Sequence, residues 1–282
     1  MLLAILLSMS LATSCQPEVQ STPALPTTIA QTLPNVAYGK DSAQRMDIYL
    51  PANRSTATTK ALILIHGGGW NGGDKRDFAT YITAFQKRMP DYAIFNINYR
   101  LVNSGSLFPA QENDVKAAVD AIVDKAAYYG FNKEKMALLG ASAGAHLALL
   151  QAYKYSTPKI AAVIDFFGPT DLTVMYQKPW HPLVPVALQV ITGTTPTANS
   201  SIYKSSSPTN FISPGVPPTL IFHGERDNVV DVSQSKLLHQ GLEKAGVAND
   251  LVIYPSERHG WYGKTLEKSF DKMQDFLKTY LP

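Results

Sequence analysis

Short, unbroken apolar runs recur along this chain of 282 residues, and helical patterns lie between them. Runs with no polar position are typical of strands that helices cover on both faces of a sheet. Strands that alternate with helices predict a mostly parallel sheet joined by right-handed crossovers. The expected strands cover 46–50, 61–65, 92–99, 135–139, 160–166, 219–223 and 250–254.

The segments between these strands carry helix start signals and apolar stripes. Asp74 is expected to cap a helix that runs to about Met89, with Asp77 in its first turn. Pro109 suits the first turn of the next helix, where a proline nitrogen needs no hydrogen-bond partner. Further helices are expected over 143–155, 232–245 and 264–278.

The segment 171–214 breaks this alternation of strands and helices. It is rich in Pro, Ser and Thr and shows no clear period. A long irregular insertion in a compact domain is usually functional or disordered. We interpret this one as a cap over the edge of the sheet at which the strands end.

Composition favours a globular protein and argues against several classes of function. Apolar residues make up 45% of the chain, enough for a core that needs no disulfide or metal to fold. The net charge is only +3 and no basic stripe occurs, so we expect no nucleic-acid partner. No zinc-ligand spacing, P-loop or dinucleotide-binding pattern is present, so we expect neither a metal nor a cofactor.

The N-terminus has the character of an export signal. Residues 2–12 are almost entirely apolar, but a helix needs about twenty such residues to span a bilayer. The sequence that ends at Cys15 resembles a bacterial lipobox, although its Leu11 stands four residues before the cysteine and no Lys or Arg lies near Met1. We therefore expect residues 1–15 to be a signal whose Cys15 is lipidated, and the alternative is an ordinary cleaved signal.

A flexible tether is expected after this signal, over 16–33, because the segment is rich in Pro, Thr, Ser and Gln. The folded domain would then cover 34–282. A lipidated chain would be exported and anchored to the bacterial envelope, at the outer membrane or in the periplasm. A chain with a cleaved signal would be secreted. The lipid would be its only contact with a membrane.

A candidate nucleophile follows the expected strand 135–139, in the sequence Gly-Ala-Ser-Ala-Gly that is centred on Ser142. The GxSxG pattern is weak by itself. Here it lies between a strand and a helix, the context of a nucleophile elbow. The tight turn of such an elbow needs small neighbours, and Gly140 and Gly144 provide them. The alternative is a small-residue turn that only serves packing.

A serine hydroxyl needs a base, and His259 is the candidate. A base of this kind is expected downstream of the serine, on a loop at the edge of the sheet, in the order Ser, Asp, His. His259 lies in the loop after the last expected strand and meets all three conditions. The alternative is a solvated loop histidine.

The carboxylate that would orient this histidine is expected at Asp227, in the loop after strand 219–223. Glu225 and Asp231 are its rivals. Glu225 lies very close to the end of the strand, and Asp231 suits the cap of the next helix.

The sequence His66-Gly-Gly-Gly-Trp70 follows the expected strand 61–65. Glycines let backbone N–H groups approach a substrate closely, and such groups stabilise the oxyanion formed during acyl transfer. We expect an oxyanion hole from this loop together with the N–H of Ala143. The alternative is a merely flexible loop.

With these motifs in this order, the chain resembles the α/β-hydrolase superfamily. It is similar to carboxylesterases of the hormone-sensitive-lipase-like group and to feruloyl-esterase-like and arylformamidase-like proteins. The matching motifs are HGGGW at 66–70, GASAG at 140–144, HGERD at 223–227 and RHG at 258–260. The resemblance implies an α/β-hydrolase fold with a mostly parallel central sheet, flanking helices and a cap insertion.

The resemblance also implies roles for individual residues. Gly68 and Gly69 would donate to the oxyanion with Ala143, whereas Gly67 would shape the turn. Arg100 and Asp171 would brace loops and take no part in the chemistry.

The expected activity is serine hydrolysis of small-molecule carboxylic esters, with short acyl or aryl groups, through an acyl-enzyme on Ser142. One alternative is an arylformamidase-like or peptidase-like amide hydrolase, because esters and amides share the same tetrahedral intermediate. Another is a catalytically inactive, surface-anchored binding module. The natural substrate and the oligomeric state are not readable from the sequence. Candidate pocket residues are Trp70, Trp180, His181 and Trp261.

Overall fold

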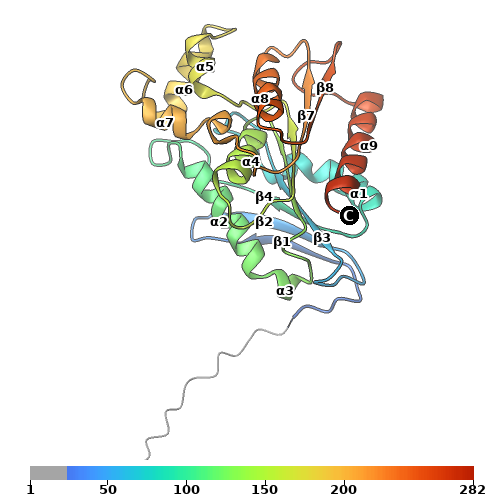
Figure 1. Ribbon diagram of the computed structural model, residues 1–282. Helices are drawn as coiled ribbons and strands as arrows, with labels where there is room; N and C mark the ends of the chain where they lie inside the picture. The colour runs from blue at the N-terminus through green and yellow to red at the C-terminus, as the bar shows by residue number, and fades with distance from the viewer. Residues whose placement is uncertain (1–23) are drawn as a thin grey trace, which may run out of the picture.

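An eight-stranded sheet runs through the computed structural model, which describes residues 24–282 (Figure 1). The strand order is β1-β2-β4-β3-β5-β6-β7-β8. β1 pairs with β2 and β2 with β4 in antiparallel fashion, and all other pairs are parallel. The strands are β1 (Gln31–Ala37), β2 (Arg45–Leu50), β3 (Lys60–Ile65), β4 (Tyr92–Ile97), β5 (Met136–Ala141), β6 (Ala162–Phe166), β7 (Thr219–Gly224) and β8 (Asn249–Tyr254).

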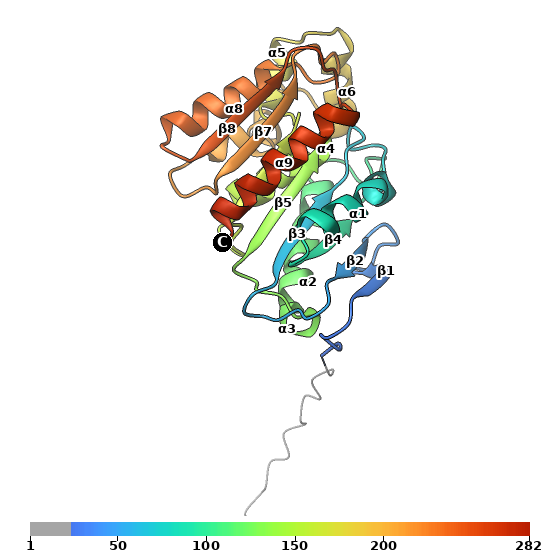
Figure 2. The same ribbon diagram turned by 90° about the vertical axis from the view of Figure 1, so that its right-hand side faces the viewer.

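Two layers of helices cover this sheet (Figures 1 and 2). α1 (Ala79–Arg88) and α9 (Gly263–Tyr280) pack on one face. α2 (Ala110–Asp124), α4 (Ala143–Lys154) and α8 (Ser233–Lys244) pack on the other. The short elements η1 (Lys75–Phe78) and α3 (Ala126–Tyr129) flank α1 and α2. The mostly parallel sheet with helices on both faces confirms the expected fold class.

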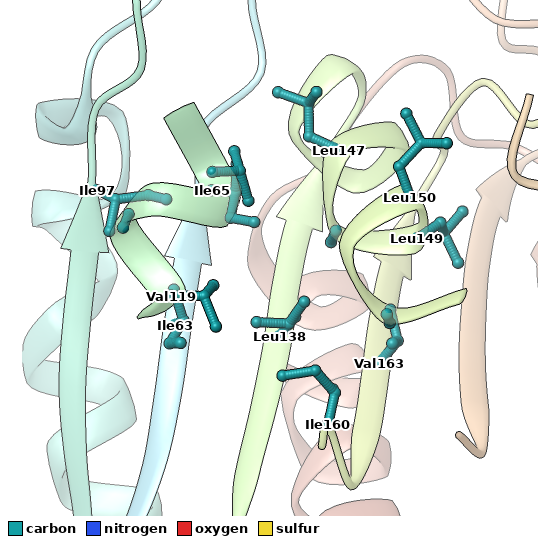
Figure 3. Close-up of a cluster of buried hydrophobic side chains, with 14 of the residues drawn as sticks. Ile63, Ile65, Ile97, Val119, Leu138, Leu147, Leu149, Leu150, Ile160 and Val163 are labelled. Atoms are coloured by element: carbon teal, nitrogen blue, oxygen red, sulfur yellow. The ribbon is translucent and has the colours of Figure 1, made fainter. Parts of the chain in front are cut away.

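The two-sided covering explains why the central strands have no polar positions. Successive side chains of a strand point to opposite faces. Ile63, Leu138 and Val163 pack beneath α2 and α4 (Figure 3), and their neighbours Leu62 and Leu139 belong to the cluster under α1 and α9. Each such side chain contributes about 1.5–3 kcal/mol when fully buried, so both faces stabilise the sheet.

β1 was not expected from the sequence, and it corrects the predicted tether over 16–33. The backbone N–H of Leu25 donates to the carbonyl of Tyr128, at 3.2 Å. Arg54, a residue only 3% exposed, donates through its guanidinium to the carbonyls of Pro26 and Ile29. Residues 24–33 are therefore held against the domain by hydrogen bonds to Tyr128 and Arg54 and by the pairing of β1, which their Pro- and Thr-rich composition did not indicate.

The predicted signal with Cys15 and the first part of the predicted tether, residues 1–23, lie outside the described residues. Over 24–282, every helix is too short or too polar to cross a bilayer.

The segment 171–214 lies beyond the ends of the strands, as expected of a cap, but it is not irregular (Figure 1). Its prolines stand where a helix tolerates them: Pro182 directly precedes α6, Pro185 lies in the first turn of α6, and Pro208 begins η2. Asp171 and Asn199 accept hydrogen bonds from the first turns of the helices that follow them. The cap elements are α5 (Leu172–Gln177), α6 (Leu183–Thr192), α7 (Ser200–Ser205) and η2 (Pro208–Phe211).

Candidate active site

Ser142 lies on the tight turn between β5 and α4, with φ of 54° and ψ of −122°. A positive φ is strained for a residue with a side chain. The turn is tight because two glycines allow it. A Cβ at Gly140 would overlap the carbonyl oxygen of Gly144, and one at Gly144 would overlap that of Ile65. The small residues around Ser142 are thus required by the close packing of strand, helix and β3.

His259 and Asp227 lie in neighbouring loops, after β8 and β7, and they are hydrogen-bonded. The Nδ1 of His259 lies 2.6 Å from the Oδ2 of Asp227, whose side chain is fully buried. A carboxylate only accepts, so this Nδ1 carries the proton, and Nε2 keeps its lone pair in the uncharged ring. The ring of Phe167 packs against His259, with centroids 4.5 Å apart. These contacts fix both the orientation and the tautomer of the imidazole.

The carboxylate of Asp227 is buried but well supplied with donors. Oδ1 accepts from the backbone N–H groups of Val229 and Val230, at 2.8 and 2.9 Å. Oδ2 also lies 3.3 Å from the Nε2 of His223. Burial raises the pKa of Asp227, but the hydrogen bonds from His223, His259 and Val230 outweigh it and hold this pKa well below its usual range. Asp227 is therefore ionised at neutral pH.

The rival acids lie elsewhere. Glu225 is exposed. Asp231 accepts a hydrogen bond from the backbone N–H of Ser233, but it stands one residue before Val232, the N-cap of α8, so it is not the helix cap that the sequence suggested. Of the three candidate carboxylates, Asp227 is the one that contacts His259.

Two other histidines serve the structure of the loops. His66 stacks on Tyr99, with centroids 4.3 Å apart. His146 is fully buried in α4 and accepts a hydrogen bond at Nδ1 from the indole of Trp70, at 3.2 Å. Its Nε2 is 2.7 Å from the carbonyl oxygen of Ser206, so it ties the glycine loop to the end of the cap.

The glycine loop after β3 presents backbone N–H groups beside Ser142. Gly68 and Gly69 have φ of 107° and 58°, a region that favours glycine. Both residues are exposed, and within residues 24–282 neither of their N–H groups donates to another protein atom. Ala143 is the first residue of α4, so its N–H has no acceptor inside the helix. Three donors are thus free to bind an anionic oxygen.

The braces expected around these loops are present. The Nε and Nη2 atoms of Arg100 donate to the two carboxylate oxygens of Asp114, at 2.8 and 2.7 Å. Asp171 accepts from the N–H of Val174 at the start of α5. Both residues hold loop ends in place, as the sequence indicated.

Ser142 and His259 both line a cavity of about 740 Å³ beneath the cap. Within the described part of the chain no hydrogen bond joins the two side chains; such contacts are often long before substrate binds. Trp70 and Trp180 line this cavity, as expected. Trp261 lines a second cavity of about 230 Å³, which His259 also lines, and His181 lines neither.

Some site residues were not found from the sequence. Phe167, with φ of 46°, lines both cavities beside His259. Asp77, expected only as a helix-dipole residue, lines both as well. His223 was noted only as the end of a strand, although it contacts Asp227. Only the Phe-Phe-Gly sequence at 166–168, directly after a strand, offered a signal for Phe167.

No cluster of three or more His, Cys, Asp or Glu side chains is arranged for a metal ion anywhere in residues 24–282. The arrangement at Ser142 combines a hydroxyl on a strained backbone turn, an oriented imidazole and free N–H donors, which are the groups that acyl transfer to a serine uses.

The chain is similar to several curated and solved proteins. The chain is 29% identical to "Probable carboxylic ester hydrolase LipM" of Mycobacterium tuberculosis, over 78% of the chain and 53% of that protein. It is 33% identical to a kynurenine formamidase of Scheffersomyces stipitis, over 40% of the chain and 41% of that protein. The chain spans about half the length of the curated relatives it matches first.

A solved carbohydrate esterase from gut microbiota, in truncated form, superposes with a TM-score of 0.78 and 26% identity. The match covers 92% of this chain and 99% of that structure. The sequence model of the BD-FAE family matches residues 46–242, well over half of the chain. The chain belongs to the BD-FAE family and has the α/β-hydrolase fold.

Proposed function

We propose that this protein is a serine hydrolase that cleaves carboxylic esters through an acyl-enzyme on Ser142. The observation that carries the proposal is the hydrogen bond from His259 to the ionised Asp227, on the wall of a cavity that Ser142 also lines. Relatives named as ester hydrolases support it.

In the first half of the reaction, the Oγ of Ser142 attacks the ester carbonyl while the Nε2 of His259 takes the hydroxyl proton. The tetrahedral oxyanion accepts from the N–H groups of Gly68, Gly69 and Ala143. The imidazolium, stabilised by Asp227, then passes its proton to the leaving oxygen. The C–O bond to the alcohol breaks, and the acyl group stays on Ser142.

In the second half, His259 takes a proton from water, and the hydroxide attacks the acyl carbon. The same three N–H groups hold the new oxyanion. The proton on Nε2 returns to the Oγ of Ser142 as the carboxylic acid leaves. One N–H donor of this type is worth about 3–4 kcal/mol of barrier, so the loop after β3 matters as much as the side chains.

The substrates we propose are small-molecule esters with short acyl or aryl groups. A cavity of about 740 Å³ beneath the cap is within the range of small-ligand sites. The walls that the cap contributes are mostly apolar and include Val184, Leu188 and Ile191 of α6. Apolar walls favour acyl groups without charge.

A second candidate is the hydrolysis of an N-formyl amide, which the likeness to a kynurenine formamidase favours. The proposed triad could hydrolyse either the ester bond or the formamide bond, because both reactions pass through the same tetrahedral intermediate. Initial rates on p-nitrophenyl acetate, butyrate and octanoate, compared with N-formylkynurenine, separate them. A value of kcat/KM at least tenfold higher for the formamide would replace the ester in this proposal.

Labelling by a fluorophosphonate probe tests whether Ser142 is a reactive nucleophile in this protein. We expect the wild-type protein and Ser104→Ala, a change in an exposed loop, to be labelled equally. Ser142→Ala should not be labelled. An unlabelled wild-type protein without esterase or formamidase activity would instead favour an inactive binding module.

We further propose that the protein is exported and anchored through a lipid on Cys15, as the lipobox-like sequence indicates. Radiolabelled palmitate fed to bacterial cells that express the full chain tests this. We expect label in the wild-type protein and none in Cys15→Ser. Equal label in both, or none in either, would refute the anchor.

A further inference from the structure

Two cavities meet at the catalytic edge of the sheet. The larger one, of about 740 Å³, lies under the cap. The smaller one, of about 230 Å³, extends between β5 and the helices α1 and α9. They share His259, Phe167, Ala141, Gly67 and Asp77, so the two cavities adjoin beside His259.

We propose that the smaller cavity binds the alcohol part of the ester and that the larger one binds the acyl part. This inference rests on the proposed ester hydrolysis. It also defines a substrate class: esters of a compact, uncharged, aromatic or benzyl-type alcohol.

The distribution of catalytic groups between the cavities supports this assignment. Ser142 and the oxyanion-hole residues Gly68 and Gly69 line only the larger cavity. The acyl carbon is bonded to the Oγ of Ser142 and its oxygen lies among those N–H groups. The acyl substituent therefore extends into the larger cavity.

Of the three proposed triad residues, His259 alone lines the smaller cavity. This residue must protonate the leaving oxygen, so that oxygen lies next to its Nε2. The group attached to the leaving oxygen then points past the imidazole, toward Gly260 and Trp261. The two halves of the ester thus separate on either side of His259.

The walls of the smaller cavity determine what it can hold. They are largely aromatic: Phe78, Tyr81, Phe85, Phe166, Trp261 and Phe270. An apolar cavity of about 150 Å³ in another protein binds benzene, so one of about 230 Å³ accommodates a single ring with a short linker. The exposed carboxylate of Asp77 at the junction disfavours an anionic alcohol.

Two matched substitutions fill one cavity each. Leu266→Trp, on α9, narrows the smaller cavity, and Ala187→Phe, on α6, narrows the larger one. Both positions lie on helices at the surface side of a cavity wall and are only partly buried or exposed. The readouts are two ratios of kcat/KM: benzyl over methyl acetate for the alcohol, and p-nitrophenyl butyrate over acetate for the acyl group.

We expect Leu266→Trp to lower the benzyl-to-methyl ratio about tenfold or more and to leave the butyrate-to-acetate ratio within twofold. Ala187→Phe should do the reverse. Acyl transfer gives a second readout, because only the alcohol site binds an added acceptor. The butyryl-enzyme of Leu266→Trp should transfer to benzyl alcohol less often, relative to methanol, than the wild-type enzyme does.

The assignment of the two cavities would be wrong if Leu266→Trp changed the butyrate-to-acetate ratio and Ala187→Phe changed the benzyl-to-methyl ratio. That result would leave the proposed ester hydrolysis intact. Unchanged ratios in both variants would also overturn the assignment. A wild-type protein that neither reacts with the fluorophosphonate probe nor turns over any of the esters would instead refute the proposed function. Leu266→Phe is measured alongside, since it reports the same ratio if the Trp variant fails to fold.

Discussion

Replacing Asp227 by Asn tests whether this carboxylate sets the tautomer of His259. Asn has one carbonyl oxygen and one NH₂ group where Asp227 has two accepting oxygens. If the Asn oxygen keeps the two backbone N–H groups of Val229 and Val230, its NH₂ group faces the Nδ1 of His259. The histidine must then accept at Nδ1 and carry its proton on Nε2, where it blocks proton transfer from Ser142.

The opposite orientation of the Asn amide is less favourable. It would restore the acceptor for His259 but would turn the NH₂ group toward the N–H groups of Val229 and Val230. Two hydrogen bonds would be lost to keep one, and each buried donor left without a partner costs about 1–3 kcal/mol. The inactive tautomer should therefore dominate.

We expect Asp227→Asn to lower kcat about 10⁴-fold, or about 5.4 kcal/mol in barrier, the size of this effect in a serine protease. The assay is the rate on p-nitrophenyl acetate at pH 7.5. Asp231→Asn is the matched control, since this side chain accepts from the N–H of Ser233 at the start of α8 and an Asn oxygen can accept the same hydrogen bond. A kcat of Asp227→Asn within tenfold of the wild-type value would refute the reasoning.

Three further predictions concern pH and packing. Asp227 should contribute no acid step to the kcat profile, because its hydrogen bonds hold its pKa well below its usual range; an acid step above pH 4 that disappears in Asp227→Asn would contradict this. Burial raises the pKa of Asp165 from 3.8 to about 6, so the folded state binds more protons than the unfolded state between these values, and stability from this group falls as pH rises through the window. Asp165→Asn, whose oxygen retains the Gly168 N–H, should then unfold in urea with a free energy about 3 kcal/mol higher than wild type at pH 8 and with little gain at pH 4, and an equal gain at both would refute the link. Gly144→Ala should destabilise the protein by several kcal/mol because its Cβ overlaps the carbonyl oxygen of Ile65, whereas Gly215→Ala, with open space around it, should stay within about 1 kcal/mol in thermal unfolding.

The sequence predicted the parts of the site that follow from topology. The carboxyl ends of parallel strands lie at one edge of a sheet, so loops that follow β3, β5, β7 and β8 had to converge there. This reasoning was sufficient to bring Asp227 next to His259 and the glycine loop next to Ser142. It used only the order of motifs along the chain.

Other features depend on contacts that no local pattern reveals. β1 contains Pro34 and only half-buried or exposed residues, so its sequence lacks the apolar run of a central strand. Two of the cap elements, α6 and η2, were hidden by prolines that stand in their first turns, and α5 and α7 are only six residues long. The smaller cavity is formed by α1, β5, β6 and α9, which are distant in sequence, and its volume depends on how those helices pack.

The proposed mechanism passes through a covalent acyl intermediate on Ser142, which mass spectrometry can detect. The wild-type protein is mixed with p-nitrophenyl butyrate, quenched with acid within the first turnovers, digested and analysed by mass spectrometry. We expect the mass of one butyryl group on the peptide that contains Ser142, and background turnover with no adduct in Ser142→Ala. Turnover that persists in Ser142→Ala, or a butyryl group on another residue during wild-type turnover, would show that Ser142 is not the nucleophile.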